Sequence, residues 1–279
     1  MAIKNHSPID TNKNMKTATR LALGIWLVSF FLGPWLWMAL VSFKKRAGIY
    51  TLPKRAFADL TIDNYSTTLI DKAFHHDLSN SLLLAILSSL VAMAAAIPAA
   101  YAISRHPYHM GKYYTFILST RFLPAISVVI PLFVIFSAIG LQGTILGITL
   151  VHASIALSLS VILLRAYFDR VPRWLDEAAR LDGAGTSGVL LAHVIPAAAF
   201  GLLVTWFLTF LVSWNEFLLA SILTSTTSRT LPVVIPGLVT PHGTYWGQVA
   251  ALGVVASFPG AIITIFMAIM RTKRKSDGA

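Results

Sequence analysis

The sequence predicts an all-α integral membrane protein with six transmembrane helices, and three observations lead to this class. The chain is 56% hydrophobic and only 12% charged, whereas a soluble domain carries roughly 25% charged residues. Six stretches are apolar enough to cross a bilayer as helices, which takes about 20 residues each. Most lysines and arginines lie at the ends of these stretches, where lipid headgroups are expected.

The first two predicted spans are residues 21–43 and 81–104. The first follows a polar tail that runs through Lys16. Its apolar run is longer than the roughly 7–15 residues of a signal-peptide core and lacks a small-residue cleavage site, so we expect a retained helix. The second contains Pro98, which allows a bend.

The third and sixth predicted spans, residues 113–139 and 246–270, also contain prolines. Pro124, Pro131 and Pro259 each free a backbone carbonyl, which a membrane tolerates where a cavity or a neighbouring helix satisfies it. These positions fit helices that bend or move.

The fourth and fifth predicted spans, residues 144–164 and 197–223, flank a long polar segment, residues 165–196. The sequence shows no repeat of solenoid length and no separate soluble domain. We therefore expect residues 1–279 to form a single transmembrane domain.

The distribution of basic residues predicts the orientation. An even number of spans puts both termini on one side, together with residues 105–112 and 165–196. These parts hold most of the lysines and arginines, so the positive-inside rule makes them and both termini cytoplasmic. Residues 44–80, on the opposite side, also carry several basic residues, which argues against this assignment. The predicted cytoplasmic parts nevertheless hold more of them.

The polar segment contains the stretch DEAARLDGAGTSG, which predicts a short helix. Pro172 suits the first helical position and Gly183 suits the position just past the end. Thr186 or Ser187 could cap a second short helix. One face of the first helix, by helical spacing, would hold Leu175, Ala178, Ala179 and Asp182. Small alanines let a partner approach the backbone closely, although an ordinary interfacial helix is the alternative.

The stretch EAARLDGAG, followed by VIP, resembles the EAA loop of the membrane subunits of binding-protein-dependent ABC importers. The residues that match at the family's spacing are Glu177, Ala178, Ala179, Gly183 and Pro196, with Asp182 and Ala184 completing the DGA of the sugar-importer branch. His193 and Ile195 depart from the usual ending of the motif. The stretches TRFLP, SWNEFLLA and TLPVVIPGL are also similar to the carbohydrate branch, related to the smaller maltose-importer permease.

This resemblance implies a type I importer permease in the inner membrane, with a cytoplasmic coupling helix seated on a separate ATPase. The expected docking residues are Glu177, Ala178, Ala179, Asp182, Gly183 and Ala184. The expected partners are a second permease subunit, two ATPase subunits, an extracytoplasmic solute-binding protein and membrane lipid. The expected function is uptake of a carbohydrate or related polar solute by alternating access.

The chain shows no catalytic machinery of its own. It lacks a G-x-x-x-x-G-K-[ST] phosphate loop, so ATP and Mg are expected on the partner ATPases. Gly183, Gly185 and Gly188 spell G-x-G-x-x-G, but no strand precedes them as a dinucleotide site requires. Cysteine is absent, and the histidines show no ligand spacing, so we expect no metal and no bound cofactor. No basic face interleaved with aromatics suggests nucleic acid.

Four residues are candidates for the solute path. Arg121 and Glu216 are ionisable groups within predicted spans, where charge is costly. Trp214 offers a flat face to a sugar ring, and Asn215 with Glu216 offers hydroxyl partners. Alternatively, both charges lie near span ends and only support packing. Arg121 leaves an anionic solute as one option.

Two other function classes compete with the importer. A secondary transporter driven by an ion gradient would need carboxylates at mid-bilayer and usually inverted repeats, and only Glu216 is available. A membrane enzyme acting on lipids would need clustered His, Asp or Glu at one interface. We interpret the polar cluster in residues 165–196 instead as a docking loop.

Overall fold

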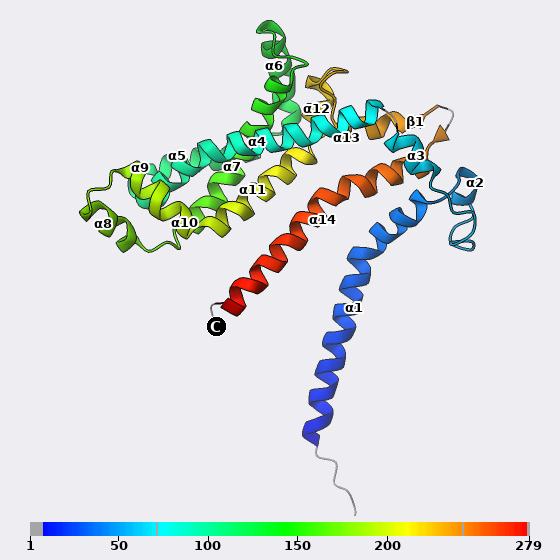
Figure 1. The fold of residues 1–279 in the computed structure, drawn as a ribbon, viewed down its shortest axis with the longest axis horizontal. Coiled ribbons are helices and arrows are strands. Elements are labelled where there is room, and N and C mark those ends of the chain that lie inside the picture. Colours follow the sequence, from blue (N-terminus) through cyan, green and yellow to red (C-terminus); the bar gives the residue numbers. More distant parts are fainter. Residues whose placement is uncertain (1–7, 71, 242, 278–279) are drawn as a thin grey trace, which may run out of the picture. The chain divides into compact units, whose positions relative to one another are not determined.

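The computed structural model describes residues 8–70, 72–241 and 243–277 (Figure 1). Contacts divide the chain into two compact units. One unit comprises Met1–Ile70 with Leu238–Ser257, and the other comprises Asp71–Gly237 with Phe258–Ala279. The division falls inside the last helix, α14 (Trp246–Asp277).

The smaller unit combines the N-terminal helix with the first part of α14. The N-terminal helix is α1 (Pro8–Ser42), and the other elements are α2 (Arg46–Ile49), α3 (Asp63–Leu69) and the antiparallel pair β1 (Val239–Thr240) and β2 (Gly243–Thr244). Lys44 is fully buried, and its ammonium donates to the carbonyls of Arg55, at 2.7 Å, and Ala58. The side chain of Asn64 donates to the Ser42 and Lys44 carbonyls. These bonds satisfy the irregular backbone after α1.

The larger unit is built on three helices that pack against one another: α4 (Lys72–Arg105), α7 (Ile145–Phe168) and α11 (Ala199–Trp214) (Figure 1). Small and hydroxyl residues fill their interfaces, as in Ser160 Oγ to Thr209 Oγ1 at 2.9 Å. Small side chains let membrane helices approach closely. The remaining elements are α5 (Pro107–Ser119), η1 (Thr120–Phe122), α6 (Ala125–Ala138), α8 (Arg173–Leu181), α9 (Thr186–Gly188), the π-helical η2 (Val189–Val194), α10 (Ile195–Ala197), α12 (Leu218–Leu223), α13 (Leu231–Val234), the second part of α14, and η3 (Ile235–Leu238), whose last residue belongs to the smaller unit.

The predicted all-α membrane class is confirmed. In the described part of the chain, four helices are long and apolar enough to cross a membrane: Thr19–Ser42, Phe74–Arg105, Ile145–Phe168 and Trp246–Met270. Two bent pairs bring the number to six, if each pair is one span: Pro107–Phe122 with Ala125–Ala138 at 95°, and Thr186–Ala197 with Ala199–Trp214 at 84°.

The third predicted span is not one continuous helix. It breaks at Leu123 and Pro124, which both have extended backbone angles. The ring of Pro124 disfavours a helical conformation at the residue before it and removes a backbone donor, so the helix ends there. The prolines were expected to bend this span, and the bend is a full interruption.

The fifth predicted span, residues 197–223, is also interrupted. α11 ends at Trp214, Asn215 is its C-cap, and α12 begins only at Leu218. The interruption coincides with the WNE stretch and is held by the Glu216 side chain, as described below. Hydropathy could not reveal it, because apolar residues continue on both sides.

The segment between α12 and α13 is tied to the first turns of α4. Arg229 donates to Asp77 Oδ2 from Nη2 at 2.8 Å and from Nε at 3.2 Å. Asn80 Nδ2 donates to the Thr227 and Arg229 carbonyls, and Ser81 Oγ accepts from Leu231 N at 2.6 Å. This Thr- and Ser-rich segment therefore has a defined conformation.

Candidate functional site

The predicted short polar helix exists as α8, with its ends shifted slightly. Pro172 is the N-cap with extended angles and not the first helical residue. Gly183 lies just past the helix end, as predicted, with φ +85°. Its N–H donates to the Arg180 carbonyl at 3.0 Å, which closes the end of the helix. The prediction that Thr186 or Ser187 caps the next helix is wrong, because Gly185 is the N-cap of α9 and no side chain bonds there.

The residues predicted to share one face of α8 are divided between its buried and its exposed side. Ala179 is only 3% exposed and packs in the core of the larger unit, whereas Ala178 is exposed. The inward face is formed by Leu175, Asp176 and Ala179. The outward residues among those expected to dock are Glu177, Ala178, Asp182 and Gly183, with Ala184 half-buried. The pattern of small residues concealed this division because Asp176, a polar residue, is on the buried side.

Asp176 fastens α8 to the end of α4. Arg105 makes a bidentate contact with its carboxylate, Nε to Oδ2 at 2.8 Å and Nη2 to Oδ1 at 2.9 Å. Tyr101 donates its hydroxyl to the same Oδ2 at 2.8 Å. Both charged side chains are under 10% exposed. A buried carboxylate with two guanidinium bonds and one hydroxyl bond is geometrically well defined. Asp176 therefore attaches α8 rigidly to α4, and we call this attachment the root of α8.

The end of α4 also holds the turn between α7 and α8. Arg105 Nη1 donates to the Phe168 carbonyl at 3.2 Å, and Ser104 donates to Asp169 Oδ1 at 2.6 Å. The Tyr101 ring stands edge-on to the Phe168 ring, with centroids 6.4 Å apart. Sequence reasoning missed Tyr101 and Arg105 as parts of this site. Arg105 was read as an interfacial charge at the end of a span.

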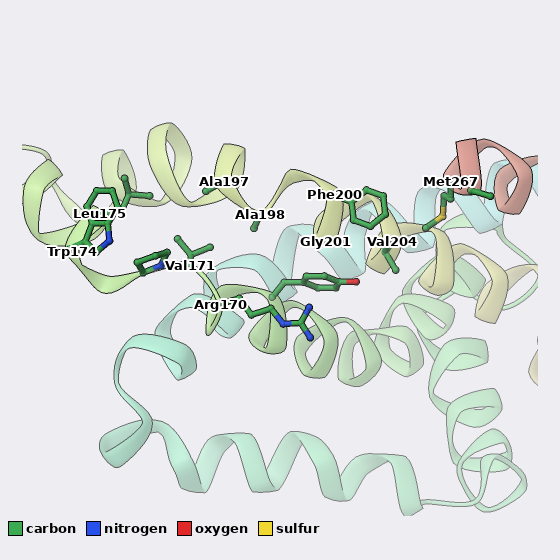
Figure 2. A pocket seen from close by; sticks show the side chains of 13 residues that line it. Arg170, Val171, Trp174, Leu175, Ala197, Ala198, Phe200, Gly201, Val204 and Met267 are labelled. Carbon is green, nitrogen blue, oxygen red and sulfur yellow. The ribbon is translucent and has the colours of Figure 1, made fainter. Parts of the chain in front are cut away.

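A groove of about 860 Å³ runs beside the first turn of α8. Figure 2 shows Trp174 and Leu175 at one end, Met267 at the other, and Arg170 and Gly201 between them. Trp174 is 64% exposed and Leu181, at the last turn of α8, is 89% exposed. The outer side of α8 thus presents large apolar side chains as well as small residues.

A second cavity, of about 450 Å³, lies where the third predicted span breaks. η1 and α6 line one side and α7 lines the other, with contributions from α5, Val212 of α11 and Leu219 of α12. Among the described residues that line it, Arg121 is the one with a charged side chain, and Thr120, Ser154 and Ser158 add hydroxyls. An interior that mixes apolar walls with a few polar groups is typical of a small-molecule site.

The other three candidates for the solute path do not line this cavity. Trp214 is 4% exposed and stacks on Phe210 with ring centroids 5.8 Å apart. Asn215 is exposed, and its Nδ2 donates back to the Leu211 carbonyl at 2.9 Å. Glu216 accepts the Leu219 and Ala220 amides, each at 3.0 Å. The structure therefore does not bring these three residues together with Arg121 in one site.

Apolar helices with a polar, rooted helix between two of them, and a partly polar cavity at a helix break, define a membrane-embedded transport subunit. Residues 92–276 match the family described as "Binding-protein-dependent transport system inner membrane component". The chain belongs to this family, and it is an ABC importer permease.

Relatives of known class agree with this assignment. The trehalose/maltose transport system permease protein MalG of Thermococcus litoralis is 32% identical over 238 residues, covering 83% of this chain and 85% of that protein. The trehalose transport system permease protein SugB of Mycobacterium tuberculosis is 32% identical over 253 residues, covering 88% and 90%. A solved bacterial ABC transporter involved in the import of the acidic polysaccharide alginate superposes with a TM-score of 0.75 at 22% identity, covering 96% and 99%, and shows the shared fold.

Proposed function

We propose that this chain carries a carbohydrate or related polar solute across the cytoplasmic membrane, and that separate ATPase subunits drive it through α8. The observation that carries the coupling proposal is the two-sided construction of α8. Asp176 roots one side in α4 through Arg105, while Glu177, Ala178 and Gly183 on the other side are exposed. The proteins named as trehalose and maltose permeases support the solute class.

The construction of α8 suits the transmission of force. A nine-residue helix is short and stiff, and its buried root lies at the junction of α4 and α7. A push on the exposed side therefore moves these packed helices as a body, because well-packed interiors deform little. Glu177, Ala178, Asp182, Gly183 and Ala184 form the proposed contact surface, and Ala179 supports it from inside.

The proposed assembly contains a second permease, two ATPase subunits that bind ATP and Mg, and an extracytoplasmic solute-binding protein. The family's description as binding-protein-dependent supports the last of these. In the proposed orientation both termini and α8 are cytoplasmic, as the positive-inside rule predicts. The segment between α12 and α13, held by Arg229 and Asp77, then faces the binding protein.

The cavity that contains Arg121 is the proposed solute path. Its guanidinium can donate hydrogen bonds to the oxygens of a polar solute, and its hydroxyl oxygens, whose protons go to backbone carbonyls, can accept from the solute hydroxyls. The ion-gradient alternative is not favoured. Glu216, the carboxylate on which it depended, already accepts two backbone amides.

Reconstituted uptake tests the proposal. The chain is placed in vesicles with its partner permease, ATPases and binding protein, and accumulation of labelled trehalose, maltose and longer oligosaccharides is measured. We expect uptake that requires ATP and the ATPase subunits. Uptake by the permeases alone under a proton or sodium gradient would overturn the proposal.

Replacing Gly183 with leucine is expected to uncouple ATP hydrolysis from uptake. The left-handed backbone at φ +85° strains a leucine by roughly 1–2 kcal/mol. No atom of this chain lies within 4 Å of the added Cβ, so the leucine side chain projects toward the docked partner. We expect uptake per ATP hydrolysed to fall roughly tenfold, with membrane insertion unchanged.

Two further variants give the control. Gly183→Asn tolerates the left-handed backbone but still adds a side chain, so it isolates the effect of bulk. Gly185→Leu adds the same bulk two residues later, where φ is −69° and space is open. We expect the Asn variant to be impaired and Gly185→Leu to be affected less. Normal coupling in Gly183→Leu speaks against docking at this position.

A further inference from the structure

A buried chain of polar side chains connects four helices of the larger unit. His152, on α7, is 1% exposed, and its Nδ1 lies 2.8 Å from Ser213 Oγ on α11. Ser88, on α4, donates its hydroxyl to the same Ser213 oxygen at 2.8 Å. His152 Nε2 lies 3.3 Å from Glu216 Oε2, which precedes α12.

The order of these contacts indicates where the protons lie. Because Ser213 Oγ accepts from Ser88, its own proton is available to Nδ1 of His152. A neutral imidazole that accepts at Nδ1 carries its proton at Nε2. That nitrogen faces Glu216 at ion-pair distance without forming a well-aligned hydrogen bond, and among the described residues it has no other polar partner. The Nε2 proton of His152 is therefore directed at Glu216, and this contact links the imidazole to the start of α12.

The carboxylate of Glu216 binds the backbone amides at the start of α12. Its Oε1 accepts the Leu219 amide and its Oε2 accepts the Ala220 amide, both at 3.0 Å. Without the carboxylate these two amides would lose their side-chain acceptor, and an unpaired backbone donor away from water is unfavourable. The same oxygen that binds Ala220 faces His152, so the imidazole and the first turn of α12 share one partner.

The wall of the smaller cavity depends on this arrangement. Leu219, whose amide binds Glu216, lines the cavity and is 2% exposed. Val151, adjacent to His152 on α7, lines it as well, as does Val212, adjacent to Ser213 on α11. Each member of the polar chain on α7, α11 and α12 thus lies next to, or binds, a residue of the cavity wall.

We propose that His152 is a positioning residue that holds Glu216, and through it the start of α12, so that Leu219 closes one wall of the solute cavity. The role of the cavity in transport rests on the proposed function above. The positioning itself is a property of the fold.

Two substitutions separate the ring nitrogens of His152. His152→Gln places an amide near the position of Nε2 and keeps the contact with Glu216. His152→Asn is one methylene shorter and reaches only the position of Nδ1, so it keeps the contact with Ser213 and loses the one with Glu216. The two variants share the same chemistry and differ in reach.

The absence of cysteine in this chain allows a test that does not depend on transport. A single Leu219→Cys is introduced with His152, His152→Gln or His152→Asn, and its reaction with a water-soluble thiol reagent is timed in the assembled complex. We expect slow labelling with His152 and with Gln, and labelling at least several-fold faster with Asn. Ser154→Cys, on α7 in the same cavity, is expected to react equally in all three backgrounds.

Kinetics of uptake give a second readout. The Asn variant is expected to raise the KM for solute severalfold with an unchanged amount of assembled complex, and the Gln variant to restore it. Equal labelling of Leu219→Cys in all three backgrounds overturns the inference, as does faster labelling at both cysteine positions, which indicates general loosening. If the wild-type complex carries no saccharide, the proposed function fails, while the labelling result still decides the positioning role.

Discussion

Replacing Asp176 with alanine is expected to abolish ATP-dependent uptake and to expose residues 165–196 to protease. The substitution leaves Arg105 buried, with side-chain exposure of 8%, and without its bidentate partner. Removing one member of a buried ion pair destabilises a protein by about 3–5 kcal/mol, because the remaining charge is uncompensated. We therefore expect α8 to detach from α4 and force to be lost between the ATPase and the bundle. Uptake assays and limited proteolysis of the assembled complex measure the two effects.

The matched control is Asp169→Asn. Asp169 pairs with Arg165 at 3.5 Å on the exposed side of the same turn, and the amide oxygen can still accept from Ser104. Exposed pairs contribute about 0–1 kcal/mol, so this variant is expected to behave like the wild type. The double variant Asp176→Leu with Arg105→Met removes both charges and is expected to recover much of the lost protease resistance. Full uptake by Asp176→Ala contradicts the assignment of a force-bearing root.

Replacing Gly201 with valine is expected to prevent the C-terminal end of α7 from packing against the first turns of α11. A Cβ at Gly201 would lie 2.3 Å from Tyr167 Cγ and 2.8 Å from Tyr167 Cβ. The ring cannot move away as a flexible tip can, because the clash reaches the base of the side chain. Overpacking typically costs about 1–3 kcal/mol and sometimes more. We expect a markedly lower yield of assembled, detergent-stable complex, measured by size-exclusion chromatography.

Two variants delimit this effect. Gly201→Ala combined with Tyr167→Gly removes all three close contacts, including the one to Tyr167 Cβ, and is expected to recover part of the yield. Gly111→Ala, in α5, adds a methyl group where no atom lies within 4 Å, and the helix propensity of alanine should make it neutral or slightly stabilising. A normal yield for Gly201→Val would mean that α7 and α11 separate more easily than their contacts indicate.

Some parts of the candidate site could be predicted from the sequence because their signals are local. The position of Gly183 followed from the preference of a helix end for a residue without a Cβ, and its φ of +85° confirms that position. The spacing of the EAA motif is also a local signal, and it located α8. The buried side of α8 could not be predicted, because the acidic Asp176 satisfies every rule for an exposed residue near a helix N-terminus.

Other parts depend on partners distant in the chain. Arg105 and Asp176 are 71 residues apart, and His152 and Ser213 are 61 apart. No periodicity in the sequence pairs them, so the sequence places Arg105 only at the end of a span and offers no partner for His152. Glu216 was recognised as unusual at membrane depth, but its bonds to Leu219, Ala220 and His152 appear only once the fifth span is seen to break.

By itself the sequence determined that this protein is a helical membrane permease with a polar helix between two of its spans. Hydropathy over about 20 residues and the EAA spacing are local properties of the chain, and they can be recognised without knowledge of any tertiary contact. Only the tertiary structure decided which polar residues are available to a partner or a solute. A buried charge needs a partner of opposite charge or a hydrogen-bonding group, and the packing of α4, α7 and α11 decides which residue lies within reach. That packing cannot be predicted from any single segment of the sequence.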